Sequence, residues 1–96
     1  MFIADIIRKN RKAILEIATR YGAMNVRLFG SMVRGTSHSS SDVDLLVSMK
    51  PGSSLLDIIA IKQDLEDLLG KKVDVVTENS ISPYIKDAVL KEAVTL

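Results

Sequence analysis

Apolar residues recur at intervals of three and four positions along three stretches of the chain, and this spacing predicts amphipathic helices. The first helix covers roughly residues 3–21 and stops at Gly22, the second covers roughly 55–69 and stops at Gly70, and the last opens at Ser82-Pro83. Their buried faces are expected to comprise Ile6, Ile7, Ile14, Ile17, Ala18 and Tyr21 in the first helix, Leu55, Ile58, Ile59, Leu65, Leu68 and Leu69 in the second, and Ile85, Ala88 and Val89 in the last.

Three shorter runs rich in β-forming residues predict strands at roughly 26–29, 41–49 and 73–77. The second strand closes at the turn dipeptide Pro51-Gly52, and residues 32–35 are expected to form a brief helical turn after the first. The order of elements is therefore α-β-α-β-α-β-α. This order indicates an α/β fold with a sheet of about three strands packed by about four helices.

The composition indicates one small domain spanning residues 1–96. Hydrophobic residues make up 47% of the chain, enough for a packed interior, whereas an aromatic content of 4% leaves little material for stacking on bases. The absence of Cys excludes a disulfide framework, a thiolate zinc site and a cysteine nucleophile. The apolar start of the chain contains Asp5 and runs into Arg8 and Lys9, so it lacks the order of a signal peptide or membrane span. The lack of Cys and of a targeting segment makes the cytoplasm the expected location, without membrane association. The net charge of +1 argues against direct nucleic-acid binding.

Three aspartates stand in unusual places for carboxylates. Asp42 and Asp44 are two positions apart in a predicted strand, so they project from the same face about 6–7 Å apart. At that distance they repel each other by about 2–3 kcal/mol at an effective dielectric constant of about 20, unless a cation lies between them. Asp74 lies inside an apolar run that is typical of a buried strand, where an unpaired carboxylate is costly. Oxygen ligands without His or Cys favour Mg²⁺, with Mn²⁺ as the next choice, over zinc.

A structural interpretation of these aspartates stays open at this point. Two aspartates separated by one residue also occur near turns at the start of a strand, and Asp74 could pair with a cation instead of binding a metal. The candidate partners are Arg27, Arg34 and Lys72.

Gly30 and Ser31 lie where the first strand runs into a turn. A glycine there lets the backbone approach an anion, and the following amides and the Ser31 hydroxyl could donate to phosphate oxygens. The alternative is a glycine needed for a tight turn and a serine that caps the next helix. Arg34 could contact a triphosphate or remain solvated. His38 has no second His to work with, so we leave it out of the site.

Taken together, three segments resemble the minimal nucleotidyltransferase branch of the DNA polymerase β superfamily: 30–35 (GSMVRG), 41–47 (SDVDLLV) and 73–76 (VDVV). The closing segments 83–86 (PYIK) and 90–93 (LKEA) are also similar to the tails of these small proteins. The resemblance implies a mixed sheet of the nucleotidyltransferase type. Many relatives have a basic residue where this chain has Met32, so Arg34 would have to supply the positive charge there.

The resemblance also implies roles for the candidate residues. Gly30 and Ser31 would hold the β- and γ-phosphates of ATP, while Asp42 and Asp44 would coordinate two Mg²⁺ ions and Asp74 would complete the site. Two such ions would activate an attacking hydroxyl and shield the charge on departing pyrophosphate, and Asp74 could take the proton of the hydroxyl.

Proteins of this family are often encoded beside a HEPN-domain ribonuclease toxin. The resemblance therefore implies an antitoxin that transfers AMP to a hydroxyl of its toxin, in the better understood cases a tyrosine. The rival hypothesis is an antitoxin that neutralises the toxin by binding alone. A third is transfer to a small hydroxylated compound, which the short chain disfavours for want of a substrate pocket. Assembly as a homo-oligomer or hetero-oligomer stays open.

Overall fold

The fold was determined as a computed structural model that describes residues 3–36 and 41–96, so His38 lies outside the described residues. The elements in chain order are α1 (Asp5–Arg20), β1 (Ala23–Phe29), α2 (Ser31–Arg34), β2 (Val43–Met49), α3 (Leu55–Leu69), β3 (Val73–Thr77), the 3₁₀ turn η1 (Glu78–Ser80), α4 (Pro83–Glu92) and β4 (Val94–Thr95). The predicted α/β class and the order of the first seven helices and strands are confirmed. The predicted strand from residue 41 begins two residues later, at Val43.

The sheet is mixed and has the strand order β3-β2-β1-β4. β1 pairs antiparallel with both β2 and β4, whereas β2 pairs parallel with β3 across the α3 crossover. The prediction of about three strands was wrong by one, because β4 has only two residues and no alternation that a sequence pattern could reveal. β4 is held by pairing with β1 and by the bond from the Leu96 amide to the Val26 carbonyl, at 2.9 Å.

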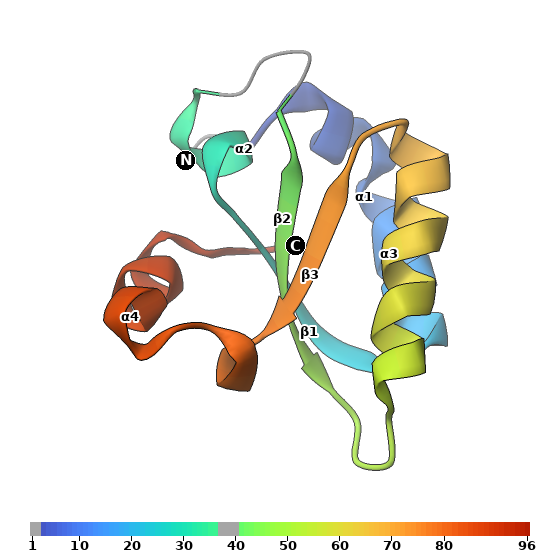
Figure 1. The fold of residues 1–96 in the computed structure, drawn as a ribbon. Helices are drawn as coiled ribbons and strands as arrows, with labels where there is room; N and C mark the ends of the chain where they lie inside the picture. Colours follow the sequence, from blue (N-terminus) through green and yellow to red (C-terminus); the bar gives the residue numbers. More distant parts are fainter. Residues whose placement is uncertain (1–2, 37–40) are drawn as a thin grey trace.

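The sheet separates two layers of helix (Figure 1). α1 and α3 lie together on one face and α4 lies on the opposite side. The main core fills the space between the sheet and the first two helices; its fully buried residues include Ile7, Ile14, Leu28, Leu45, Ile61 and Leu65. Alternate residues of β2, namely Val43, Leu45 and Val47, face this core. The residues between them, which include Asp44, therefore face the α4 side of the sheet.

The helix faces differ from the predicted ones in α3 and α4. In α3 the buried residues are Ile61, Leu65 and Leu69, which are spaced four apart, while Leu55 is 69% exposed. In α4 only Val89 is buried, and Ile85 remains 53% exposed. The α1 face is confirmed at its centre by the buried residues Ile7, Ile14 and Ala18. The error has a physical reason: apolar residues outnumber the positions that the sheet can cover, and sequence periodicity does not reveal which of them the sheet reaches.

The predicted signals mark the end of α3 and the start of α4. Gly70 closes α3 in the left-handed conformation, with φ of 65°. Ser82 precedes α4 and its side chain accepts a hydrogen bond from the Tyr84 amide. None of the helices in the described part of the chain has both the length and the apolar character that a bilayer span requires.

Candidate functional site

Two of the three predicted aspartates are direct neighbours across the parallel strand pair. Asp44 of β2 stands opposite Asp74 of β3 in the register of the sheet. The residues before them, Val43 and Val73, are fully buried in the core, so both aspartates project from the α4 face. Asp42 lies two positions before Asp44, just ahead of β2. The fold thus places Asp44 and Asp74 side by side on one face of the sheet, with Asp42 close enough for its charge to act on Asp44.

The electrostatics of Asp44 reflect this crowding. The pKa of the half-buried Asp44 carboxyl is raised above its ordinary value, first by burial and then by the negative charges of Asp74 and Asp42. Glu92 adds a smaller effect in the same direction, while the Arg34 guanidinium opposes it. Four carboxylates and one guanidinium therefore act on the same small region, and their charges leave it strongly acidic.

Gly30 brings a backbone turn into direct contact with this region. It ends β1 beside the pair Phe29 and Asp44, and it adopts a φ of 79° that other residues rarely tolerate. A Cβ atom at this position would overlap the Asp44 Oδ2 atom. Glycine is therefore required here for two reasons, the backbone conformation and the space taken by the carboxylate.

The residues after Gly30 form a short helical turn, as the sequence predicted. Ser31 begins α2 and Arg34 ends it, and the Gly30 carbonyl accepts hydrogen bonds from the amides of Val33 and Arg34. The Arg34 side chain is 60% exposed. The structure thus places the three residues predicted to bind phosphate, Gly30, Ser31 and Arg34, on one turn beside the aspartates.

A residue that the sequence did not single out also contacts this turn. Glu92, the last residue of α4, accepts a hydrogen bond from the Gly30 amide at 2.9 Å and forms an ion pair with Arg34 at 3.3 Å. The segment 90–93 was recognised as similar to family tails, but without a role for the glutamate. One signal could have drawn attention to it: an acidic residue at the C-terminal end of a helix is unfavourable, because the carbonyl groups there carry partial negative charge.

Two of the three cations considered as structural partners of Asp74 form ion pairs with glutamates. Arg27 forms an ion pair with Glu78 at 2.9 Å, and Arg34 pairs with Glu92. Lys72 remains a candidate partner, so the structural interpretation of Asp74 stays open.

Outside the aspartate cluster, α3 fixes the start of β3. One oxygen of Glu66, Oε2, accepts hydrogen bonds from the Val73 amide and from Lys62, each at 2.9 Å. Lys62 also donates to the Val73 carbonyl at 2.8 Å. These bonds lower the pKa of Glu66, the backbone bond from Val73 most of all. Because Val73 immediately precedes Asp74, this contact between α3 and β3 sets the position of one site aspartate.

Two further observations bear on ligands. Among residues 3–36 and 41–96, no group of three His, Cys, Asp or Glu side chains is arranged to hold a metal ion.

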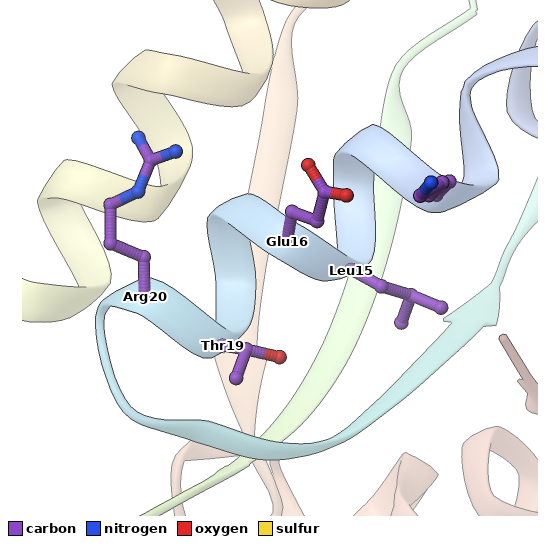
Figure 2. Close-up of a pocket in the computed structure, with 5 residues that line it drawn as sticks. Leu15, Glu16, Thr19 and Arg20 are labelled. Carbon is purple, nitrogen blue, oxygen red and sulfur yellow. The ribbon is translucent and has the colours of Figure 1, made fainter.

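A shallow hollow of about 550 Å³ lies along α1 and is lined by Lys12, Leu15, Glu16, Thr19 and Arg20. Figure 2 shows that the labelled lining residues come from α1 alone. None of them belongs to the predicted site.

The sequence matches known proteins over most of its length. Residues 8–96 match the family described as nucleotidyltransferase domain. A Methanocaldococcus jannaschii protein that is provisionally named a protein adenylyltransferase is 43% identical over 88 residues, which cover 92% of this chain and 95% of that protein. Protein adenylyltransferase MntA of Thermococcus cleftensis is 39% identical over 92 residues, which cover 96% of this chain and 90% of that protein.

Solved structures share the fold. One that is provisionally described as a minimal nucleotidyltransferase superposes with a TM-score of 0.86 at 42% identity, covering 100% of this chain and 98% of that one. A toxin-antitoxin structure with AMP-PNP superposes with a TM-score of 0.76 at 25% identity, covering 90% of this chain and 71% of that one.

Proposed function

The chain belongs to the nucleotidyltransferase domain family, and on this premise we propose that it transfers AMP from ATP to a hydroxyl group of a partner toxin and thereby acts as an antitoxin. Support comes from its relative in Thermococcus cleftensis, which is named a protein adenylyltransferase, and from the similar toxin-antitoxin structure with AMP-PNP. That the toxin has a HEPN domain and offers a tyrosine is what the family resemblance implies.

The observation that carries the proposal is the meeting of an acidic cluster with the Gly30 turn, whose amide donates to the Glu92 carboxylate. Asp44 and Asp74 are opposite each other in the sheet, and the Gly30 backbone lies against Asp44. An acidic cluster alone would repel a triphosphate, and a turn alone would bind any anion. Side by side, they suit a ligand that contains both a divalent cation and phosphate groups.

Hard carboxylate oxygens without His or Cys are the kind of donors that suit Mg²⁺, although Asp42, Asp44 and Asp74 do not form a ready-made ligand set within the described residues. Burial and like charge raise the pKa of Asp44 despite the opposing Arg34 guanidinium, so a further cation would stabilise its ionised form. Asp42, Asp44 and Asp74 would hold the metal, and it would shield negative charge on the phosphates and lower the pKa of the attacking hydroxyl. Gly30, Ser31 and Arg34 would hold the β- and γ-phosphates through the amide, hydroxyl and guanidinium donors.

The reaction is then an in-line displacement. The oxygen of the acceptor hydroxyl attacks the α-phosphorus of ATP, the bond from that phosphorus to the bridging oxygen of the β-phosphate breaks, and pyrophosphate leaves. Asp74 takes the proton of the hydroxyl. No covalent intermediate with the protein is needed, in keeping with a chain that has no Cys.

The test is to incubate the protein with ATP, Mg²⁺ and the HEPN-domain toxin encoded next to it, and to measure the intact mass of the toxin. We expect a gain of one or more AMP groups, located on tyrosine by fragmentation. The matched control is the double variant Asp42→Asn and Asp44→Asn, which should give no mass gain. Suppression of toxicity without any mass gain in the wild-type reaction would refute the enzymatic proposal in favour of an antitoxin that acts by binding alone.

A further inference from the structure

Glu92 already engages two of the groups assigned to phosphate. Its two carboxylate oxygens are divided between them: Oε2 accepts from the Gly30 amide at 2.9 Å and Oε1 pairs with the Arg34 Nε atom at 3.3 Å. The Glu92 side chain is 25% exposed, whereas that of Arg34 is 60% exposed, so the ion pair stays open to water on the Arg34 side. A carboxylate and a phosphate are both anions that accept hydrogen bonds through oxygen, so they compete for the same donors.

The location of Glu92 makes this contact unfavourable for a purely structural bond. Its carboxylate adds negative charge next to Asp44, which already faces Asp74 and Asp42. It also lies at the C-terminal end of α4, where the helix carbonyls disfavour an anion. As a structural bond, the negative charge strengthens the pairing with Arg34 but is opposed by the neighbouring carboxylates. What the negative charge also adds is competition with another anion.

We propose that Glu92 is an internal competitor for nucleotide phosphate: its carboxylate holds the Gly30 amide and Arg34 until the triphosphate of the incoming nucleotide displaces it. This inference rests on the nucleotide site proposed above. Through Glu92, α4 would lower the affinity of the site for nucleotide in addition to packing against the sheet.

The displacement requires movement of one side chain. The backbone on either side of Glu92 is fixed, because the Ala93 amide bonds to the Val89 carbonyl at 2.9 Å and the next two residues pair with β1 as β4. The chain beyond is held by Leu96, whose carbonyl accepts hydrogen bonds from Arg11. Rotation about the side-chain bonds of Glu92 is therefore the route by which the two donors become free.

The test is isothermal titration calorimetry with ATP and Mg²⁺ on the full chain and three variants. Glu92→Ala removes the competing carboxylate, and Glu92→Gln keeps the shape but removes the charge. Asp87→Asn is the matched control, because Asp87 is exposed on the same helix and its replacement changes the net charge equally. Circular dichroism melts establish that each variant is folded.

Removal of a charged competitor should strengthen binding of ATP with Mg²⁺ about 3- to 10-fold in Glu92→Ala and by a smaller factor in Glu92→Gln. Asp87→Asn should stay within about twofold of the wild type, as expected of a screened surface charge. As a second measurement, the NMR resonance of the Gly30 amide should shift in Glu92→Ala, which removes its carboxylate acceptor, and in wild type it should shift when ATP with Mg²⁺ replaces that acceptor; a Gly30 resonance unchanged by ATP in both proteins would overturn the inference.

Unchanged or weaker binding by a folded Glu92→Ala variant overturns the inference, and so does a lack of binding by both that variant and the wild type. An equal gain in Asp87→Asn also overturns it, because the effect would then come from net charge. The result is separable from the proposed function. Tighter binding without AMP transfer to the toxin supports the competitor and refutes the transfer, whereas transfer with unchanged binding does the reverse.

Discussion

Two half-buried carboxylates near the start of β3 have opposite environments. Glu66 reaches Val73 from α3 and receives hydrogen bonds from an amide and a lysine, so its pKa is lowered. Asp44 projects from the other face of the sheet and stands opposite Asp74, the residue after Val73. The pKa of Asp44 is raised by burial and by neighbouring carboxylates. The same chemical group is thus stabilising in one position and unfavourable in the other. A half-buried carboxylate that is crowded by others of its kind is a candidate for a site that a ligand completes.

The largest expected effect comes from Asp44→Asn. AMP transfer should fall at least about 100-fold, equivalent to about 2.7 kcal/mol of transition-state stabilisation, because a metal ligand is lost. The melting temperature should nevertheless rise by a few degrees at neutral pH, because a crowded charge is removed. Calorimetric melts and the toxin mass assay measure the two quantities. Asp67→Asn, at an exposed position of α3, is the control that should change neither. A lower melting temperature with transfer intact would show that Asp44 is a structural residue.

Gly30→Ala should destabilise the fold more than the same change at Gly52. The two glycines have similar backbone conformations, with φ of 79° and 88°, so strain of about 1–3 kcal/mol is common to both variants. Only at Gly30 does the added Cβ meet Asp44, whereas nothing lies within 4 Å of it at Gly52. Urea denaturation measures both, and the difference between their free energies of unfolding isolates the overlap with the carboxylate. Equal losses would mean that the Gly30 turn does not lie against Asp44.

Glu66→Gln should lower the melting temperature by a few degrees, the reverse of the effect expected at Asp44. The charged form of Glu66 is favoured by the bonds from Val73 and Lys62, and a neutral amide binds these donors less well. Glu66 bonds to Val73, the residue before Asp74, so the change also tests whether the contact with β3 positions Asp74. Lys62→Met, which removes the other half of the contact, should give a loss in the same direction. A melting temperature equal to that of the wild type would indicate that the α3 contact contributes nothing to stability.

The smallest effect is a pH dependence with opposite signs at the two carboxylates. The folded-state pKa of Asp44 lies above its unfolded value, so its contribution to stability becomes less favourable as pH rises through the raised pKa. The advantage of Asp44→Asn should therefore be smallest near about pH 4 and increase toward about pH 7. For Glu66, whose folded-state pKa is lowered, the stabilising contribution is complete above the unfolded pKa and is lost as pH falls through the lowered one. Urea titrations of both variants from about pH 3 to about pH 7 measure the two slopes, and slopes of the same sign would contradict the comparison.

Much of this arrangement follows from local sequence. Periodicity predicts α1 and α3, and alternation places Asp42 and Asp44 on one side of a strand, as the fold has Asp44. The glycine that ends β1 could be identified because a turn was needed there. Glu92 could not be given a role, because its contact with Gly30 spans 62 residues and depends on the return of the chain along β1 as β4. More residues of α4 were predicted to be buried than the one, Val89, that is, since sequence periodicity does not reveal how little of that helix the sheet covers.

The parallel pairing of β2 and β3 has a consequence for the time course of folding. Strands that run in the same direction cannot join through a tight turn, so Asp44 and Asp74 meet only after α3 has crossed over and docked. Contacts between segments so distant along the chain tend to form late, after the more local antiparallel pair of β1 and β2. If the transition state forms before this pairing, the mutual repulsion of the two aspartates is absent from it and accelerates unfolding more than it slows folding. In that case the chain retains the two aspartates with little effect on its folding rate.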